Sequence, residues 1–210
     1  MTVATSAAAL SRTLILTRLM PLFAVSGVAA LMYQICWQRL LFVAFGVDVD
    51  SVTIIVSTFM LGLGVGALVG GQLADRFPNR TLTLFALIEL GIGAFGAASP
   101  TLIRAVGAIA IHGSLPTIAI ANFLLLLFPT VLMGATLPIL VAHVVRTYNS
   151  IGVSIGLLYF VNTLGAAAGA AVTGFIALYH FGLTPTIYLA AALNAAVACA
   201  VWLGLRSARA

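Results

Sequence analysis

The chain has 210 residues, of which 63% are hydrophobic and 6% are charged, with a net charge of +5. A soluble surface needs about a quarter charged positions, so this composition excludes a soluble globular protein and indicates one that lies in a lipid bilayer. All nine basic residues are arginines scattered singly between apolar runs, which excludes a nucleic-acid-binding surface. The cysteines and histidines are not at disulfide or metal-ligand spacing, so no metal site is expected at Cys36, His112, His143, His180 or Cys199.

Six apolar runs are long enough to cross a bilayer, which takes about 20 helical residues. We therefore expect an all-α integral membrane protein with spans at 19–45, 51–74, 82–98, 117–141, 151–178 and 185–205. Residues 19–205 then form one six-helix transmembrane domain, between an N-terminal segment (1–18) and a tail (206–210). Residues 99–116 are expected to be an external segment at the membrane surface. A cleaved signal peptide is the alternative for the first run, but no convincing small-residue cleavage site follows it.

The arginines predict the orientation, because short loops rich in arginine stay on the cytoplasmic side. With the N-terminus inside, seven arginines lie inside, and only Arg39 and Arg104 lie outside. Asp48 and Asp50 then belong to the first external loop. We expect a multi-pass protein of the cell inner (plasma) membrane with both termini in the cytoplasm.

The turn after the second predicted span carries Asp75, Arg76 and Arg80, with Gly71 four residues before the acid. This pattern resembles the Gly-x-x-x-Asp-Arg-x-Gly-x-Arg loop of major facilitator transporters, with Pro78 in place of the second glycine. In that family the loop belongs to a charge-pair network that is remade as the protein changes its facing. The alternative is a stop signal whose arginines hold the loop in the cytoplasm. The position of the loop favours the first hypothesis, because it lies between the second and third spans, as it does in the transporter family. Six spans with both ends inside are also one half of that fold.

Longer stretches narrow the resemblance. The chain is similar to the membrane region of the fused transporter/spermidine-synthase-like family over "YQICWQRL" (33–40), "GGQLADR" (70–76), "FPTVLMGATLPIL" (128–140) and "LLYFVNTLGAAAGA" (157–170). Relatives commonly carry Glu where this chain has Gln34. They also continue into a soluble aminopropyltransferase-like domain, whereas this chain ends at Ala210. The resemblance therefore implies a half-size membrane protein with no enzyme activity, catalytic residue or cofactor in these residues.

Polar groups inside the spans are the strongest indication of a site, because each needs a partner or a water-lined cavity. Glu89 is the one acid placed within a predicted span, about 12 Å deep at 1.5 Å per residue. It is interpreted either as a structural hydrogen-bonding group, with Asn162 or Thr58 as partner, or as a proton or cation site. Asn162 and Asn194 are interpreted either as interhelical hydrogen-bonding groups or as substrate contacts. Together with Gln34, Glu89 and Asn162 are the predicted substrate or proton site.

The outer end of the first span carries Tyr33, Trp37 and Arg39. Tyrosine and tryptophan at this level usually anchor a helix at the lipid–water interface, and an arginine there extends its charge toward water. The alternative is an external gate in which Arg39 pairs with Asp48 or Asp50.

Glycines recur every fourth residue in the second and fifth spans, at Gly62, Gly66 and Gly70 and at Gly165 and Gly169. Such spacing places them on one helix face, where they let another backbone approach closely, so helix packing is predicted, with a sliding gate surface as an additional role. Because they lie within membrane spans, they are not a dinucleotide-binding fingerprint.

Two functions from different classes remain open. The first is a half-size transporter that moves a small metabolite, with a polyamine or related amine as the candidate, as a homodimer. The second is a scaffold that holds a separately encoded synthase-like enzyme, or another membrane complex, at the bilayer. Glu89 and the Asp75–Arg76 loop favour transport, while the scarcity of charge inside the spans and Gln34 favour the scaffold. Expected partners are the lipid bilayer and either a second copy or a membrane or synthase-like protein.

Overall fold

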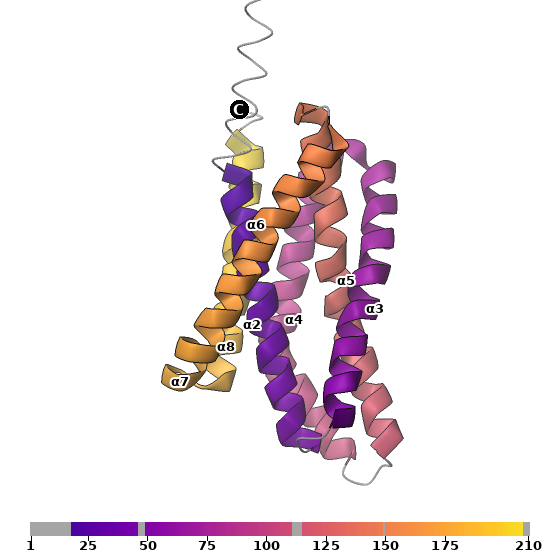
Figure 1. Ribbon diagram of the computed structural model, residues 1–210, viewed down its shortest axis with the longest axis vertical. Helices are drawn as coiled ribbons and strands as arrows, with labels where there is room; N and C mark the ends of the chain where they lie inside the picture. The colour runs from indigo at the N-terminus through magenta and orange to yellow at the C-terminus, as the bar shows by residue number, and fades with distance from the viewer. Residues whose placement is uncertain (1–17, 46–48, 111–114, 149, 208–210) are drawn as a thin grey trace, which may run out of the picture.

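The computed structural model describes residues 18–45, 49–110, 115–148 and 150–207. Its six long helices are α2 (Met20–Phe45), α3 (Val49–Arg76), α4 (Thr81–Ala110), α5 (Leu115–Tyr148), α6 (Ile151–Val172) and α8 (Leu183–Ser207) (Figure 1). Three short elements join them: η2 (Pro78–Arg80), the π-helical turn η3 (Thr173–Ala177) and α7 (Leu178–His180). Six helices, with α6 continuing through η3 and α7, are long and apolar enough to cross a membrane, which confirms the predicted all-α fold.

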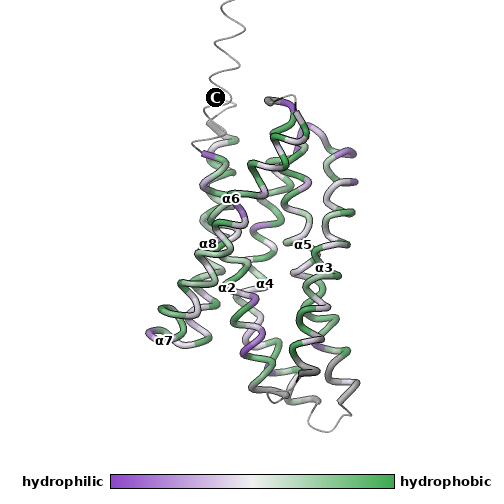
Figure 2. Tube along the Cα trace, in the orientation of Figure 1, coloured by the Kyte–Doolittle hydropathy of each residue, from purple (hydrophilic) through white to green (hydrophobic). Residues whose placement is uncertain are grey.

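Successive helices run up and down, so the start of α2 and the end of α8 lie at the same end of the bundle (Figure 1). Hydrophobic residues cover most of the helix lengths, and the hydrophilic stretches are short (Figure 2). The turn formed by η2 connects α3 to α4 at the end where α8 finishes. This arrangement places the loop with Asp75 and Arg76 on the side that the sequence predicts to be cytoplasmic.

The expected external segment at 99–116 is wrong for its first part, because α4 continues as a helix to Ala110. Pro100 lies inside this helix and has no N–H, so the carbonyl of Gly96, four residues earlier, loses its usual donor. The hydroxyl of Ser99 donates to this carbonyl at 2.7 Å and satisfies it. The helix can therefore continue through the proline inside an apolar environment. Residues 111–114 lie outside the described part of the chain.

Helix α5 likewise continues through two prolines, Pro129 and Pro138. Thr130 follows the first of them, and its hydroxyl donates to the carbonyls of Leu126 and Leu127 at 2.9 Å each. This back-bonding satisfies the buried hydroxyl, whereas the carbonyl that Pro129 leaves without a helical donor is that of Leu125, four residues earlier. Proline thus leaves both α4 and α5 as single long helices.

The helices pack as two interlocked sets of three. The first set is α2, α3 and α4, and the second is α5, α6 and α8. Helix α3 of the first set packs mainly on α5 of the second, and α6 of the second set packs mainly on α2 of the first. The contact of α4 with α5 is matched by the contact of α8 with α2, while α4 and α8 pack on each other. Exchanging α2, α3 and α4 with α5, α6 and α8 leaves this pattern unchanged, and the two sets run in opposite directions. The bundle therefore has the arrangement of two inverted three-helix repeats.

Glycines bring the main helix pairs into close contact. A Cβ added at Gly66 of α3 would lie 2.9 Å from the Cα of Gly134 on α5, and one at Gly70 would lie 2.6 Å from the Cα of Ala135. Gly62 faces the side chain of Thr130 in the same way. Since real Cβ atoms do not approach this closely, only glycine permits this approach of α3 to α5.

The equivalent contact in the second repeat joins α6 to α2. A Cβ at Gly165 would lie 2.8 Å from the carbonyl carbon of Ala24, and one at Gly169 would lie 2.8 Å from the Cα of Val28. All five predicted packing glycines therefore face a helix of the same chain. The ridge of Gly62, Gly66 and Gly70 is covered by α5 and is not available to a partner copy.

Candidate functional site

Glu89 lies on α4 at the centre of the bundle and has no solvent-exposed surface. Its Oε1 accepts a hydrogen bond of 2.5 Å from the Ser26 hydroxyl of α2, and its Oε2 accepts one of 2.7 Å from Asn194 Nδ2 of α8. The carboxyl group therefore joins three helices. Because an unpaired acid in an apolar environment is expensive, these two donors are what allow α4 to carry Glu89 at this depth.

The partners of Glu89 differ from those expected. Asn162 and Thr58 were the predicted partners, whereas the structure provides Ser26 and Asn194. Ser26 was missed because an isolated serine in an apolar run is common, and nothing in its local sequence shows which helix it faces. The one available signal was that Ser26 precedes Gly27, because a pair of small residues in a span is typical of a place where another helix packs closely.

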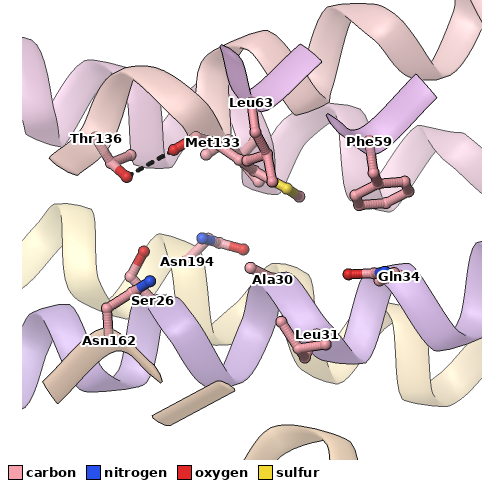
Figure 3. A pocket seen from close by; sticks show the side chains of 11 residues that line it. Ser26, Ala30, Leu31, Gln34, Phe59, Leu63, Met133, Thr136, Asn162 and Asn194 are labelled. Carbon is pink, nitrogen blue, oxygen red and sulfur yellow. Dashed lines mark hydrogen bonds between the residues drawn. The ribbon is translucent and has the colours of Figure 1, made fainter. Parts of the chain in front are cut away.

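A cavity of about 120 Å³ lies next to this hydrogen-bonded group (Figure 3). Phe59, Leu63, Met133 and Thr136 of α3 and α5 form one wall, and side chains of α2, α6 and α8 form the opposite wall. The complete lining is Ser26, Ala30, Leu31, Gln34, Phe59, Leu63, Ile92, Met133, Thr136, Asn162 and Asn194. At about 30 Å³ per water molecule, the volume corresponds to about four waters or a ligand of similar size.

Two predicted site residues, Gln34 and Asn162, line this cavity without contributing to the Glu89 hydrogen bonds. Both are partly exposed, and both carry an amide that can donate and accept. The structure thus brings together Gln34, Asn162 and, behind Ser26 and Asn194, Glu89. No arginine of the described residues lines the cavity.

Asn194 links the buried acid to the cavity. It is 1% exposed, and its Nδ2 is used by Glu89, but its Oδ1 has no hydrogen-bond partner among the described residues. A buried carbonyl oxygen without a donor costs about 1–3 kcal/mol, so native structures rarely keep one without a reason. Since Asn194 is part of the cavity wall, a donor group of a bound molecule would satisfy this oxygen.

Aromatic side chains gather around Tyr33 and Trp37 on α2. Tyr33 and Trp37 stack with their ring centroids 4.9 Å apart, and Trp37 also contacts Phe59 of α3 and Phe95 of α4. Tyr33 and Trp37 are fully buried inside the bundle, so neither side chain is an anchor on its lipid-facing surface, which was the simpler of the two interpretations. Because Phe59 belongs both to this cluster and to the cavity wall, the aromatic residues lie next to the cavity on the side toward the end of α2.

Arg39 differs from Tyr33 and Trp37 because its side chain is exposed. It lies at the surface beside Phe42, Leu178 and Leu183. Its predicted partner Asp48 lies outside the described residues, and the side chain of Asp50 is likewise not described. The external gate therefore stays a prediction for Arg39, while Tyr33 and Trp37 belong to the interior.

The Asp75–Arg76 loop lies at the opposite end of the bundle from the aromatic cluster. Asp75, Arg76 and Arg80 are all exposed, and the Arg76 guanidinium lies 5.9 Å from the centre of the Phe77 ring. No ion pair joins Asp75 to the part of the chain that the structure describes. A Cβ at Gly71 would meet open space, so this glycine serves no close packing in this conformation. The loop is therefore separate from the cavity.

Among the described residues, the other titratable groups lie outside the lining of the cavity. His143 Nδ1 lies 3.3 Å from the Thr81 hydroxyl, which connects the end of α5 to the start of α4. Within the described ranges, no group of three or more His, Cys, Asp or Glu side chains could hold a metal ion.

Comparisons with known proteins give one similarity. No protein-family model matches the chain, and no solved structure matches it. Among curated proteins, the chain is similar to the polyamine aminopropyltransferase of Oceanobacillus iheyensis, with 26% identity over 182 residues. The similarity covers 84% of this chain and 33% of that relative, so the chain spans about a third of the relative's length. The protein is thus an all-helical, membrane-type chain that is similar over most of its length to one third of a polyamine aminopropyltransferase.

Proposed function

We propose that the chain is a half-size transporter that moves a small amine, of which a polyamine is the candidate, through the cavity beside Glu89. The observation that carries this proposal is a cavity inside the bundle whose wall includes several polar side chains, in a protein whose outer surface is largely apolar. Gln34, Asn162 and Asn194 provide hydrogen-bonding groups there, and Glu89 provides negative charge directly behind them. A bilayer-spanning protein that served only as an anchor would have no need of such a cavity.

The helix arrangement supports transport independently of the cavity. Two inverted three-helix repeats with a polar site where they meet are the architecture of many secondary transporters, including each half of major facilitator proteins. The loop with Asp75, Arg76 and Arg80 also has the position expected for that family. The similarity to a polyamine aminopropyltransferase supports an amine as the substrate class.

A complete transport pathway of this type needs two six-helix units. Gln34 and Asn162 line the cavity and remain partly exposed within the membrane-spanning region, so a cavity that opened to lipid would leave their amides in an unfavourable environment. We therefore propose that a second copy covers the open side of the cavity. Glycines of the α3–α5 contact play no part in this dimer.

Transport by purified protein tests the proposal directly. The full chain would be reconstituted in vesicles, and uptake of radiolabelled 1,4-diaminobutane and spermidine would be measured against empty vesicles. Asn162→Leu fills the cavity wall and should abolish uptake, whereas Thr163→Leu, at the next and exposed position, should preserve it. Equal uptake by wild type and Asn162→Leu would reject the cavity as the pathway. Absence of uptake of either amine by a dimeric, folded wild type would favour the scaffold function.

A further inference from the structure

The hydrogen bonds of Glu89 determine which atoms the cavity wall presents to a ligand. An ionised carboxylate only accepts hydrogen bonds, so the Ser26 hydroxyl and the Asn194 amide must both turn their hydrogens toward it. This orientation matches the structure, where Ser26 Oγ lies 2.5 Å and Asn194 Nδ2 lies 2.7 Å from the two carboxylate oxygens. The remaining atoms of both side chains on the cavity wall are then acceptors: Asn194 Oδ1 and the free lone pair of Ser26.

Thr136 adds a third acceptor on the opposite wall, because its hydroxyl hydrogen is already used. It donates to the carbonyl of Met133 at 2.7 Å, which leaves its oxygen as an acceptor for the cavity. With Glu89 ionised, the cavity wall thus presents hydrogen-bond acceptors, and the negatively charged Glu89 carboxylate lies behind Ser26 and Asn194, to which it is hydrogen-bonded. A primary ammonium group, with three donors and one positive charge, has the complementary chemistry.

Protonation of Glu89 reverses this pattern, whichever oxygen takes the proton. A proton on Oε2 would require Asn194 to turn its oxygen toward the acid, so that its NH₂ group faces the cavity. A proton on Oε1 would require the Ser26 hydroxyl hydrogen to turn away from the acid. In each case the wall loses an acceptor, gains a donor and loses the negative charge, so an ammonium group is no longer favoured.

We propose that the Ser26–Glu89–Asn194 network exchanges a proton for a protonated amine. This inference rests on the proposed function, because it takes the cavity to be the substrate site. When the ammonium binds, the Glu89 carboxylic acid gives its proton to water in the cavity, and the ammonium occupies the site beside the resulting carboxylate. For each ammonium group that enters beside Glu89, one proton leaves, so the charge next to this carboxyl group stays balanced. Glu89 acts through its two neighbours as a positioning residue, while Asn194 contacts the amine.

Few other groups compete for this role. Among the described side chains on the helices around Glu89, Tyr33 and Cys36 of α2 are buried, Tyr188 and Cys199 of α8 are exposed, and His143 is near the end of α5. The other charged side chains described on α2, α4, α5 and α8 are the exposed arginines Arg39, Arg104 and Arg146. None of them lines the cavity. Tyr33 is a phenol, which is uncharged at neutral pH.

Binding of 1,4-diaminobutane to the full chain in nanodiscs tests the exchange. We expect about one proton to be released per diamine in weakly buffered solution. The diamine affinity should rise up to about tenfold per pH unit over the range in which free Glu89 is protonated, as linkage requires. Infrared spectra should lose the C=O band of a protonated carboxylic acid when the diamine is added. Glu89→Gln should lack this band, bind the diamine about tenfold or more weakly at high pH, and release no proton.

Two variants separate this coupling from simple contact. Asn162→Ala, which alters the cavity but not the network, should weaken diamine binding at every pH and keep the proton release. Ser26→Ala removes one donor to Glu89 and should alter the pH dependence while the cavity wall otherwise stays intact. Both comparisons can be made against the wild type even if Glu89→Gln does not fold.

The outcomes distinguish the two levels of the argument. Diamine binding without proton release or loss of the carboxylic acid band would overturn the exchange and leave the cavity as an amine site. No diamine binding to the folded wild type at any pH would overturn the exchange and would also remove the amine from the proposed function.

Discussion

The indole Nε1 of Trp37 on α2 donates a 2.8 Å hydrogen bond to the hydroxyl of Ser99 on α4. Ser99 in turn donates to the Gly96 carbonyl that Pro100 leaves without a helical donor. A single chain of hydrogen bonds therefore satisfies the indole of a fully buried tryptophan and repairs the helix around a proline. This chain fixes the position of the aromatic side chains beside the cavity.

Trp37→Phe should destabilise the protein, because it removes the donor to Ser99 and leaves space where the larger ring was. A double-mutant cycle with Ser99→Ala should give a coupling energy of about 0.6 to 1.7 kcal/mol, the range known for hydrogen bonds between membrane helices. Thermal unfolding in detergent would measure it. Trp202→Phe, at a position 43% exposed, is the control and should change little. A coupling energy of zero would show that the hydrogen bond adds nothing to packing.

Gly66→Leu should prevent correct packing of α3 on α5, because a Cβ at this position already overlaps Gly134. The expected loss is at least about 1–3 kcal/mol, the usual cost of overpacking, and the backbone contact makes relief difficult. Gly64→Leu is the matched control on the same helix, where a Cβ would meet nothing within 4 Å. Unfolding curves in detergent should separate the two variants clearly. Equal stability would mean that the α3–α5 contact is not formed as described.

Tyr33→Phe should be neutral or slightly stabilising in the ligand-free protein. The Tyr33 hydroxyl is fully buried, and the described residues provide no hydrogen-bond partner for it. Removing an unsatisfied polar atom avoids a desolvation cost of about 1–3 kcal/mol. Thermal unfolding tests this expectation. A clear loss of stability would indicate that the hydroxyl has a bound partner, such as a water molecule.

Membrane orientation can be tested with single cysteines in a variant lacking Cys36 and Cys199. A membrane-impermeant thiol reagent added to intact cells should label Asp50→Cys and fail to label Asn79→Cys, because the arginine bias places η2 inside. Permeabilised cells provide the control, in which Asn79→Cys should react, since this position is exposed. The reverse pattern would invert the orientation.

Asp75→Asn tests whether the loop is a conformational latch. Asp75 is exposed, and no ion pair with the described residues holds it here, so a latch would engage in the other facing of the protein. The variant should insert normally but change the rate at which a carbodiimide labels Glu89 from each side of a vesicle. Asn79→Ala, in the same turn, should label like the wild type. Unaltered labelling by Asp75→Asn would leave the loop as a topological signal.

The six helices were predictable because the bilayer imposes a simple requirement on sequence. Each span needs a long apolar run, and the polar turn from Asp75 to Arg80 interrupts two such runs. The length of α4 was not predictable in the same way. Its continuation through Pro100 depends on Ser99 and on a tryptophan of another helix, and proline in a local window indicates only a break.

The candidate site was partly predictable for a related reason. Polarity within an apolar run identifies Glu89, Asn162 and Asn194, because such residues are costly in a membrane. Their pairing depends on which helices are neighbours and on how each helix is rotated about its axis. Ser26 reaches Glu89 across 63 residues of sequence, and Asn194 reaches it across 105. Such distant pairs leave no local pattern.

The interlocked helix pairs also determine when the protein can acquire its structure during synthesis. The glycine face of α3 is matched by Val131 and Gly134 of α5, and the surface of α2 around Ala24 and Val28 by α6. When the ribosome has released α2, α3 and α4 but not the later helices, neither surface has its partner, and Glu89 lacks Asn194. These helices must therefore remain incompletely packed in the bilayer, or bound to an insertion chaperone, until α5, α6 and α8 have been inserted. Nascent chains that end before α5 should therefore be sensitive to proteases, and cutting the gene between α4 and α5 should yield two fragments that are stable only when made together.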